Sequence, residues 1–316
     1  MEIPITQSKS WQKLQEDLHE ESIFIEKEDF QFLAIKKKTP FGNYLYCPYG
    51  PVANDAKAFK LALSSLLDHA KQHNCFFIRV EPFDANFTKN LPKNTKKTKD
   101  LNPKETWILN LDTDDDTLNY KLPSRLLRYY KSAEKKGITI TRSHNPDDIK
   151  HLVDLQKALA NQKHISTFST DYLKTELAQP FSTLYLVHYQ NPETNQTEIV
   201  AAGLVFDDET IRYNLQGAQS DTGRKLHATG ILTIQLIKDA KDKGLKAFDF
   251  WGIAPENAPK NHPWRGFTEF KKTFAGTQKD HAGTYDIVLN PFKYKLYQVT
   301  RAINMKLRKL GWILSP

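Results

Sequence analysis

The sequence has few of the features that identify common classes of protein. It contains only two cysteines among 316 residues, Cys47 and Cys75, too few for a disulfide scaffold. We interpret both as buried thiols in a reducing compartment. No run of about 18 apolar residues occurs, and the opening residues MEIPITQSKSWQ include no apolar segment of signal-peptide length. These absences predict a cytoplasmic protein.

The common motifs of nucleotide-binding and hydrolytic enzymes are also missing. There is no G-x-x-x-x-G-K-[ST], G-x-G-x-x-G, G-x-S-x-G or H-E-x-x-H, so those classes of chemistry lose support. His69 and His73 have a spacing that suits a metal, but no further ligand accompanies them. The run DTDDD, residues 112–116, begins like a calcium loop and lacks its Gly and Glu, so we interpret it as a strand end and a helix cap. We expect no metal and no cofactor.

The composition is that of a globular protein of enzyme size. Hydrophobic residues make up 39% and aromatic residues 11%, enough for a packed interior. A chain of 316 residues is too long for one ordinary core, so two domains are expected. The net charge of +8 would draw the protein weakly towards phosphates or an anionic bilayer.

The second half of the chain repeats the order of the first. Helix, strands, long helix and strand occur in both halves, and the two long helices with their following strands are NDAKAFKLALSSLLDHAKQHN with CFFIRV and ATGILTIQLIKDAKDKG with KAFDFWG. When Asn74 is laid over Gly244 without a gap, the apolar positions of these helices coincide. Asn and Gly both tolerate the left-handed conformation at a helix end. We therefore favour an internal duplication.

Three further segments are interpreted from their composition. Ser10 is expected to cap a first helix, and the lysine-rich segment from Ala85 to Lys104 is expected to be an exposed loop. A helix at SRLLRYYKSAEKK should end at Gly137. The last segment should be helical because apolar residues recur at three or four, namely Phe292, Leu296, Val299, Ile303 and Leu307. Its final cations, Lys306, Arg308 and Lys309, suit the helix dipole.

The order of strands and helices in each half resembles an N-acyltransferase of the GNAT type. Such folds bind the acyl donor near the start of the central helix, where free backbone N–H groups favour phosphate. That segment reads RKLHATG here, with His227 where the acetyl-CoA motif has a glycine. Coenzyme A is therefore the weaker of the possible donors.

Five segments in order resemble the Fem family of peptidoglycan-bridge aminoacyltransferases, including its compact FemX-like members: RLLRYYKSAEKKGITI, YNLQGAQSD, KAFDFWGIAP, FTEFKKTFAG and TYDIVLNPFKYKLY. The resemblance implies an α/β fold of two tandem GNAT-like domains, here without a helical-hairpin insertion. It implies a first domain over residues 1–138, completed by a C-terminal helix over 290–316, that binds the acceptor. Residues 139–289 would form a second domain that binds the donor.

The resemblance also implies an activity. The family transfers an amino acid from aminoacyl-tRNA to an amine of the peptidoglycan stem peptide, carried on lipid II or on UDP-MurNAc-pentapeptide, in cross-bridge formation during cell wall biogenesis. Direct aminolysis of a tRNA ester needs a neutral attacking amine and stabilisation of the oxyanion, with no covalent enzyme intermediate. We expect a monomer that is cytoplasmic or peripheral at the inner face of the plasma membrane.

Site residues follow from the same resemblance. Phe270 and Lys271 match the Phe-Lys pair of the donor site, where the lysine would neutralise phosphate or developing charge and the ring would stack on the terminal adenosine. Asp112, five residues after Trp107, matches an aromatic and acidic pair near the acceptor and would receive or orient the amine proton. One of Lys36, Lys37 and Lys38 would bind the UDP diphosphate, and Arg212 and Tyr213 would begin a strand near the acceptor cleft.

Other interpretations remain open on the sequence. Phe267, Phe270 and Phe274 could form one buried helix face while Lys271 and Lys272 meet water, with Phe267 and Phe274 the better core candidates. The protein could instead be an acyl-CoA-dependent N-acyltransferase. It could also be a non-catalytic protein that binds RNA or a membrane surface through its positive charge.

Overall fold

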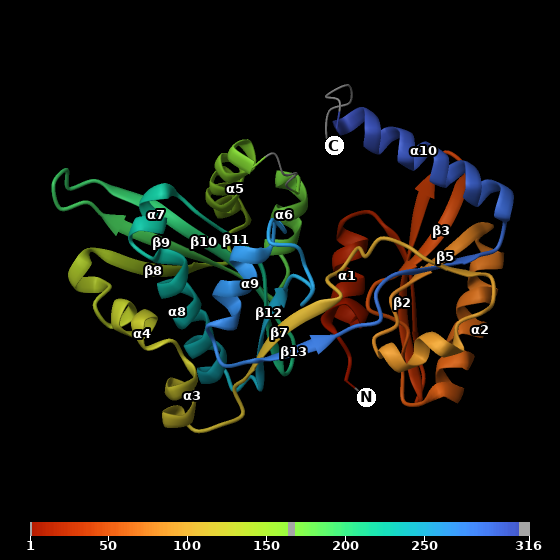
Figure 1. Ribbon diagram of the computed structural model, residues 1–316, viewed down its shortest axis with the longest axis horizontal. Coiled ribbons are helices and arrows are strands. Elements are labelled where there is room, and N and C mark those ends of the chain that lie inside the picture. Colours follow the sequence, from red (N-terminus) through yellow and green to blue (C-terminus); the bar gives the residue numbers. More distant parts are fainter. Residues whose placement is uncertain (1, 164–167, 310–316) are drawn as a thin grey trace. The chain divides into compact units, whose positions relative to one another are not determined.

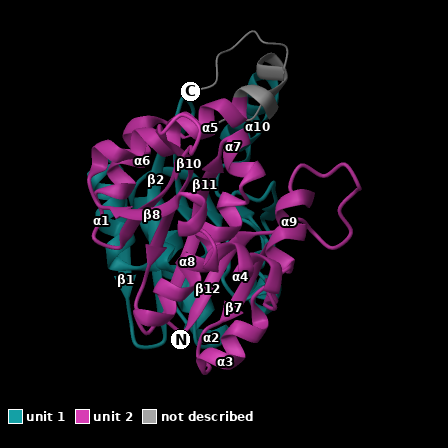
Figure 2. Cartoon of the chain, turned by 90° about the vertical axis from the view of Figure 1, so that its left-hand side faces the viewer, with its two compact units in different colours: residues 1–104, 280–316 teal, residues 105–279 magenta. Residues whose placement is uncertain are grey.

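The computed structural model describes residues 2–163 and 168–309 (Figure 1). The chain divides into two compact units, coloured separately in Figure 2. Unit 1 consists of residues 1–104 with 280–316, and unit 2 consists of residues 105–279. Each unit is built on a seven-stranded mixed sheet. The α/β class and the two-module organisation predicted from the sequence are confirmed.

The boundaries of the units differ from the predicted domain boundaries. Residues 105–138 lie in unit 2 and residues 280–289 lie in unit 1, whereas we had assigned each segment to the other domain. The cause is strand pairing. β7 (Glu105–Asn110) pairs with β12 (Ala247–Gly252), and β14 (Tyr285–Val288) pairs with β5 (Cys75–Val80).

Unit 1 has the strand order β1-β2-β3-β5-β14-β6, with β4 paired to β2. Its further elements are α1 (Lys9–Asp17), β1 (Glu21–Glu26), β2 (Phe30–Thr39), β3 (Gly42–Cys47), β4 (Val52–Ala53), α2 (Ala56–Gln72), η2 (Ala85–Asn90), β6 (Thr95–Lys97) and α10 (Pro291–Lys309). The apolar face of α2, including Phe59 and Leu66, packs on Phe32 and Ile78 of the sheet. Cys47 and Cys75 are free and buried in this unit.

Unit 2 has the strand order β13-β7-β12-β11-β10-β9-β8. Its further elements are α3 (Asp115–Lys121), α4 (Ser124–Lys131), β8 (Ile138–Ser143), α5 (Ile149–Lys163), α6 (Thr170–Leu177), β9 (Ser182–Gln190), β10 (Thr197–Asp207), β11 (Ile211–Gln219), α7 (Asp221–Lys225), α8 (Ala228–Asp242), α9 (Arg265–Lys272) and β13 (Thr277–Asp280). The central helix α8 is almost wholly buried against the sheet and α4. α5 packs on β10 and β11.

The predicted duplication is visible in the topology. In unit 1 the parallel strands β3 and β5 are joined through α2, and in unit 2 the parallel strands β11 and β12 are joined through α8. Asn74 (φ 52°) and Gly244 (φ 80°) both end these helices in the left-handed conformation. The next strand of each sheet is exchanged. β7 follows the elements of unit 1 in the chain but completes the sheet of unit 2, and β14 does the reverse.

Several local predictions are settled by the structure. Gly137 ends a helical turn with φ 71°, and Asp114 caps α3 by accepting a hydrogen bond from the Thr117 backbone N–H at 2.8 Å, both as predicted. The cap of α1 is Ser8 and not Ser10, because the helix begins at Lys9. The lysine-rich segment is not all loop, since it contains η2 and β6. The last helix forms, although the side chains of Lys306, Leu307, Arg308 and Lys309 lie outside the described residues.

Candidate active site

A strained turn ends β12 in unit 2. β11 and β12 are paired over Ile211–Tyr213 and Ala247–Asp249 only, and the pairing of β12 with β7 is irregular between Asp249 and Gly252. At that irregularity Trp251 has φ 66°, a conformation that costs a bulky residue about 1–2 kcal/mol. Asp249 Oδ1 accepts a hydrogen bond from the Trp251 backbone N–H at 2.7 Å and holds the turn. The Gly252 carbonyl that follows receives a hydrogen bond from a side chain of α9.

That side chain is Lys271. Its Nζ donates a hydrogen bond to the Gly252 carbonyl oxygen at 2.6 Å. Burial lowers the pKa of this ammonium group to about 8, and the charge of Asp249 acts in the opposite direction. Near neutral pH the lysine is therefore a cation that gives up its proton more readily than an exposed lysine does. Such a group can stabilise a developing negative charge and donate a proton.

Aromatic packing fixes the helix that carries Lys271. Phe274 is fully buried, and its ring lies 4.9 Å from that of Phe250 and 5.5 Å from that of Phe270. Trp107 on β7 donates its indole N–H to the Phe274 carbonyl at 3.0 Å. A Cβ at Gly276 would lie 2.6 Å from the Ile108 carbonyl oxygen, so only glycine fits this close approach. Phe270, Lys271 and Trp107 are thus brought together.

The prediction that Phe267 belongs to the core is wrong, whereas that for Phe274 is confirmed. α9 begins at Arg265, so Phe267 lies in its first turn with 48% of its surface exposed. Lys272 is exposed, as expected for a solvated position, and its Nζ lies 5.4 Å from the centre of the Trp107 ring. The ammonium group of Lys272 therefore lies over an aromatic ring and is more exposed than that of Lys271.

Asp112 is not brought to Lys271. It lies just beyond the carboxyl end of β7, exposed, and pairs with Lys246 at 3.1 Å. Thr106, at the other end of β7, is the residue that pairs with Gly252. At a rise of about 3.3 Å per residue, the six residues from Thr106 to Asp112 span about 20 Å. Asp112 and Lys271 therefore mark opposite ends of the same strand pair.

Arg212 and Tyr213 have structural partners that the sequence analysis missed. Arg212 is fully buried and forms two hydrogen bonds to Asp207, Nε to Oδ1 at 2.6 Å and Nη2 to Oδ2 at 2.7 Å. The β10–β11 hairpin places these two residues directly opposite each other. The buried Tyr213 donates its hydroxyl to Asp208 Oδ2 at 2.8 Å. We therefore correct their assignment from substrate contacts to supports of the sheet.

Lys36, Lys37 and Lys38 lie on β2 in unit 1, each paired with an acidic residue before or in β1. Lys36 and Lys38 contact Glu21 at 2.6 and 3.2 Å, and Lys37 contacts Glu20 at 2.7 Å. The side chain of Lys38 is the most accessible of the three, with 74% exposed, compared with 15% for Lys36. Lys38 is thus the most available of the three to an anion from solvent.

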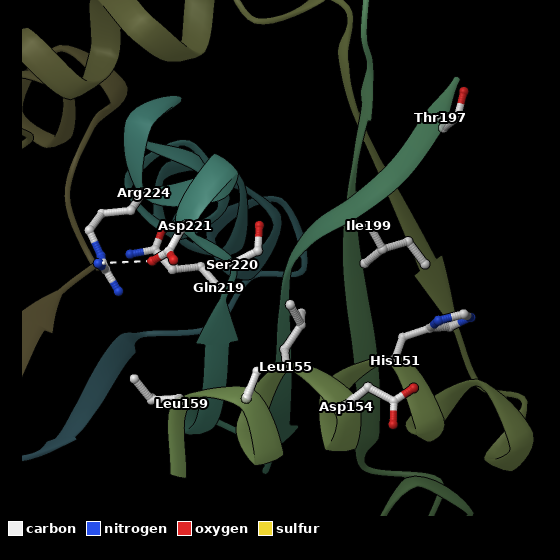
Figure 3. Close-up of a pocket in the computed structure, with 11 residues that line it drawn as sticks. His151, Asp154, Leu155, Leu159, Thr197, Ile199, Gln219, Ser220, Asp221 and Arg224 are labelled. Atoms are coloured by element: carbon white, nitrogen blue, oxygen red, sulfur yellow. Dashed lines mark ion pairs between the residues drawn. The ribbon is translucent and has the colours of Figure 1, made fainter. Parts of the chain in front are cut away.

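The start of α8 does not offer a phosphate cradle. The Thr229 backbone N–H donates to Gln219 Oε1 at 3.4 Å. His227 adopts φ 57° and stacks on Tyr129 with ring centres 4.4 Å apart. A pocket of about 610 Å³ lies nearby between α5, β10 and α7, and an ion pair of Arg224 with Asp221 crosses its edge (Figure 3). One backbone N–H of this helix start is therefore engaged by the chain's own Gln219, and His227 stands where the acetyl-CoA motif has a glycine.

Residues 2–163 and 168–309 contain neither a candidate membrane span nor a candidate metal cluster. Among these residues no helix combines the length and apolar character needed to cross a membrane. The same residues contain no group of three or more His, Cys, Asp or Glu side chains placed to hold a metal ion. His69 lies in the last turn of α2 and His73 caps that helix.

Known proteins resemble this chain in one sequence segment and in its fold. Residues 182–301 match the FemAB family. No curated protein matches the sequence. The structure of FemX is similar with a TM-score of 0.77 and 18% identity, covering 93% of this chain and 94% of that one.

Two further structures are similar at lower scores. One is the C-terminal domain of a putative lysylphosphatidylglycerol synthetase from Agrobacterium fabrum, with a TM-score of 0.60, 13% identity and coverage of 95% and 92%. The other is L-PGS from Bacillus licheniformis, with a TM-score of 0.58, 15% identity and coverage of 96% and 99%. At these identities the likeness shows a shared fold. The resemblance inferred from the sequence is confirmed, since residues 182–301 match the FemAB family and the fold is like that of FemX.

Proposed function

We propose that the protein is an aminoacyltransferase that moves an amino acid from aminoacyl-tRNA to an amine of a peptidoglycan stem peptide. The observation that carries the proposal is the half-buried Lys271, held on the Gly252 carbonyl beside Phe270 in a segment that matches the FemAB family. His227 in place of the acetyl-CoA motif's glycine, and the engaged Thr229 N–H at the start of α8, support tRNA over coenzyme A as the donor. The proposal assigns the donor to unit 2 and the acceptor to unit 1.

The proposed reaction is direct aminolysis of the aminoacyl ester. The neutral amine of the acceptor attacks the ester carbonyl, a C–N bond forms, and negative charge develops on the carbonyl oxygen. The Lys271 cation stabilises that charge, an effect typically worth about 100- to 1000-fold in rate. As the tetrahedral intermediate collapses, the C–O bond to the ribose breaks, and Lys271 supplies the proton that the departing ribose oxygen needs. The proton released by the attacking amine returns the lysine to its charged form.

Phe270 and Trp107 shape the proposed donor site. Phe270 is half-buried against the core beneath α9, which leaves part of the ring for stacking on the terminal adenosine. Trp107 holds the end of the helix through its indole N–H. Asp112 has no part in the proposal because it lies at the far end of β7.

The experiment is mass spectrometry of stem-peptide acceptors after incubation with the protein and a mixed aminoacyl-tRNA pool. UDP-MurNAc-pentapeptide and lipid II are offered separately, and the expected product is heavier by one amino-acid residue. Parallel reactions offer acetyl-CoA as the donor and phosphatidylglycerol as the acceptor, which covers the lipid reaction that the name of the Agrobacterium fabrum protein indicates. Turnover with acetyl-CoA alone would overturn the proposal.

A matched pair of variants tests the role of Lys271. We expect Lys271→Met to slow transfer at least about 100-fold while the fold survives, because an oxyanion partner is lost. Lys272→Met removes a neighbouring lysine that is exposed and should leave the rate nearly unchanged. Equal rates in the two variants would remove Lys271 from the mechanism.

A further inference from the structure

The last helix of unit 1, α10, presents an apolar stripe to solvent. Its members share a spacing of four, three and four residues, and their exposed fractions are 73% for Phe292, 40% for Leu296, 51% for Val299 and 50% for Ile303. At 100° per residue this spacing places all four side chains within one narrow sector of the helix. Large apolar side chains gathered on one exposed face indicate an interaction surface.

The orientation of α10 is fixed from its other side. Tyr294 is fully buried and donates its hydroxyl to Asp286 Oδ2 at 2.8 Å. The Tyr294 and Tyr297 rings each lie 5.3 Å from the ring of Phe77 on β5. The tyrosines thus take the place against the sheet that an apolar stripe ordinarily takes. The stripe of Phe292, Leu296, Val299 and Ile303 is consequently held outward by the packing of the helix.

The charge around the stripe is of one sign. The sequence Pro291–Lys309 contains no Asp or Glu. Lys293 and Lys295 are exposed, and the helical repeat places them on the two flanks of the stripe. An apolar face with basic flanks is typical of helices that lie in the interface of an anionic membrane.

We propose that the apolar stripe of α10 inserts into the surface of a bilayer that contains anionic phospholipids, while Lys293 and Lys295 reach the headgroups. Charge selects this occupant over a second copy of the chain, because two copies meeting at the stripe would bring their basic flanks together. The inference concerns where the protein is placed and does not rest on the proposed transfer reaction.

The first test is flotation of the full chain with lipid vesicles. The vesicles contain either phosphatidylcholine alone or phosphatidylcholine with a third of the lipid replaced by phosphatidylglycerol. We expect the protein to bind the anionic vesicles and to bind the neutral ones at least about tenfold more weakly. The reason is that each lysine near an anionic surface adds to the free energy of binding. The double variant Phe292→Ser/Val299→Ser should bind anionic vesicles at least about tenfold more weakly.

A matched control separates the stripe from general surface hydrophobicity. Tyr120 on α3 of unit 2 is 92% exposed, more than any member of the stripe, and Tyr120→Ser should bind vesicles like the unchanged protein. Circular dichroism and the melting temperature report whether the variants fold. Three results would overturn the proposal: no binding to anionic vesicles, equal binding by the double variant, or stripe-dependent self-association without vesicle binding.

A second test locates the contact on the helix. Cys47 and Cys75 are buried, so a single introduced cysteine can be labelled with an environment-sensitive dye in the folded protein. A dye on Val299→Cys should shift to shorter emission wavelengths when anionic vesicles are added. A dye on Asn304→Cys, about 110° around the helix from the stripe, should shift much less. Equal shifts at both positions would show adsorption without insertion of the stripe and would refute the inference.

Discussion

Each unit contains a buried glutamate, and the two glutamates differ in how their carboxyl oxygens are hydrogen-bonded. Glu81 in unit 1 accepts five hydrogen bonds, from the Tyr46 hydroxyl, the Tyr49 backbone, the backbone and side chain of Asn102, and the Thr284 hydroxyl. Glu176 in unit 2 is equally buried, but among the described residues its Oε2 has no hydrogen-bond partner. Burial raises the pKa of Glu176 to about 8, with a hydrogen bond from Tyr172 acting in the opposite direction.

The difference extends to the basic groups of the two units. Both units keep one buried arginine in a two-point pair with an aspartate, Arg79 with Asp286 and Arg212 with Asp207. Among the described residues, a lysine with a pKa well below its ordinary value occurs in unit 2 alone, namely the half-buried Lys271. Each unit therefore contains a structural ion pair, between β5 and β14 in unit 1 and between β10 and β11 in unit 2. Among the described residues, the glutamate and the lysine whose charge burial disfavours, Glu176 and Lys271, both lie in unit 2, which carries the candidate active site.

The largest expected effect comes from breaking the glutamate network of unit 1. Glu81→Leu leaves several buried donors without an acceptor, so we expect the free energy of unfolding to fall by about 3–5 kcal/mol. Urea unfolding followed by circular dichroism measures the change. Glu81→Gln keeps one acceptor oxygen and should lose less. A loss below about 1 kcal/mol in the leucine variant would show that the network adds little to stability.

A smaller effect, of opposite sign, is expected at Glu176. Its folded pKa of about 8 lies above the ordinary value of 4.5, so the folded state keeps this proton when the unfolded state has released it. Stability should then fall as the pH rises from about 4.5 to about 8, by up to about 1.4 kcal/mol per pH unit. Glu176→Gln should remove this contribution to the pH dependence. The loss of unfolding free energy between pH 5 and pH 8 should therefore be smaller in the variant than in the unchanged protein, by about 2–4 kcal/mol.

The control for Glu176 is Glu193→Gln in the exposed turn between β9 and β10. It should leave the pH dependence of unfolding unchanged. Urea midpoints at several pH values compare the three proteins. Parallel pH profiles for the unchanged protein and Glu176→Gln would contradict the comparison between the two buried glutamates.

The third prediction concerns the pH dependence of transfer. If Lys271 acts as a cation, its contribution is present below its pKa of about 8 and is lost above it. We expect the rate at saturating substrate to fall about tenfold per pH unit above that value. Lys271→Arg keeps a charge at all these pH values and should lack this falling limb. A rate that rises through pH 8 in the unchanged protein would assign Lys271 as a base instead.

The smallest effect is expected for Lys272, an exposed side chain whose Nζ lies over the Trp107 ring. An exposed cation–π contact contributes about 0.5–1 kcal/mol, so Lys272→Met should lower the free energy of unfolding by no more than that. Urea unfolding measures the change. A loss of several kcal/mol would show that Lys272 contributes more to stability than its exposed position indicates.

The order of helices and strands is predicted well from the sequence, because each element depends on a local pattern of residues. Apolar spacing located α2 and α8, and the residues Asn74 and Gly244 marked their ends. The family resemblance pointed to Phe270 and Lys271, and their role in catalysis stays a prediction. Phe274 was correctly placed in the core by its spacing.

The remaining features depend on which strands lie side by side. Arg212 has the type and position of a ligand residue, and only the register of the β10–β11 hairpin shows that Asp207 faces it. Asp112 follows Trp107 closely in sequence, but an extended strand separates its end from Lys271. The strained Trp251 and its Asp249 partner gave no signal in FDFWG, because a left-handed conformation at tryptophan contradicts its local preference.

The exchanged strands β7 and β14 make the two halves of the chain depend on each other for folding. A fragment of residues 1–104 lacks β14, the strand that lies between β5 and β6. A fragment of residues 105–316 contains β14 but lacks β5, with which β14 pairs. The chain should therefore unfold as one cooperative body, and fragments should regain structure only by complementing each other.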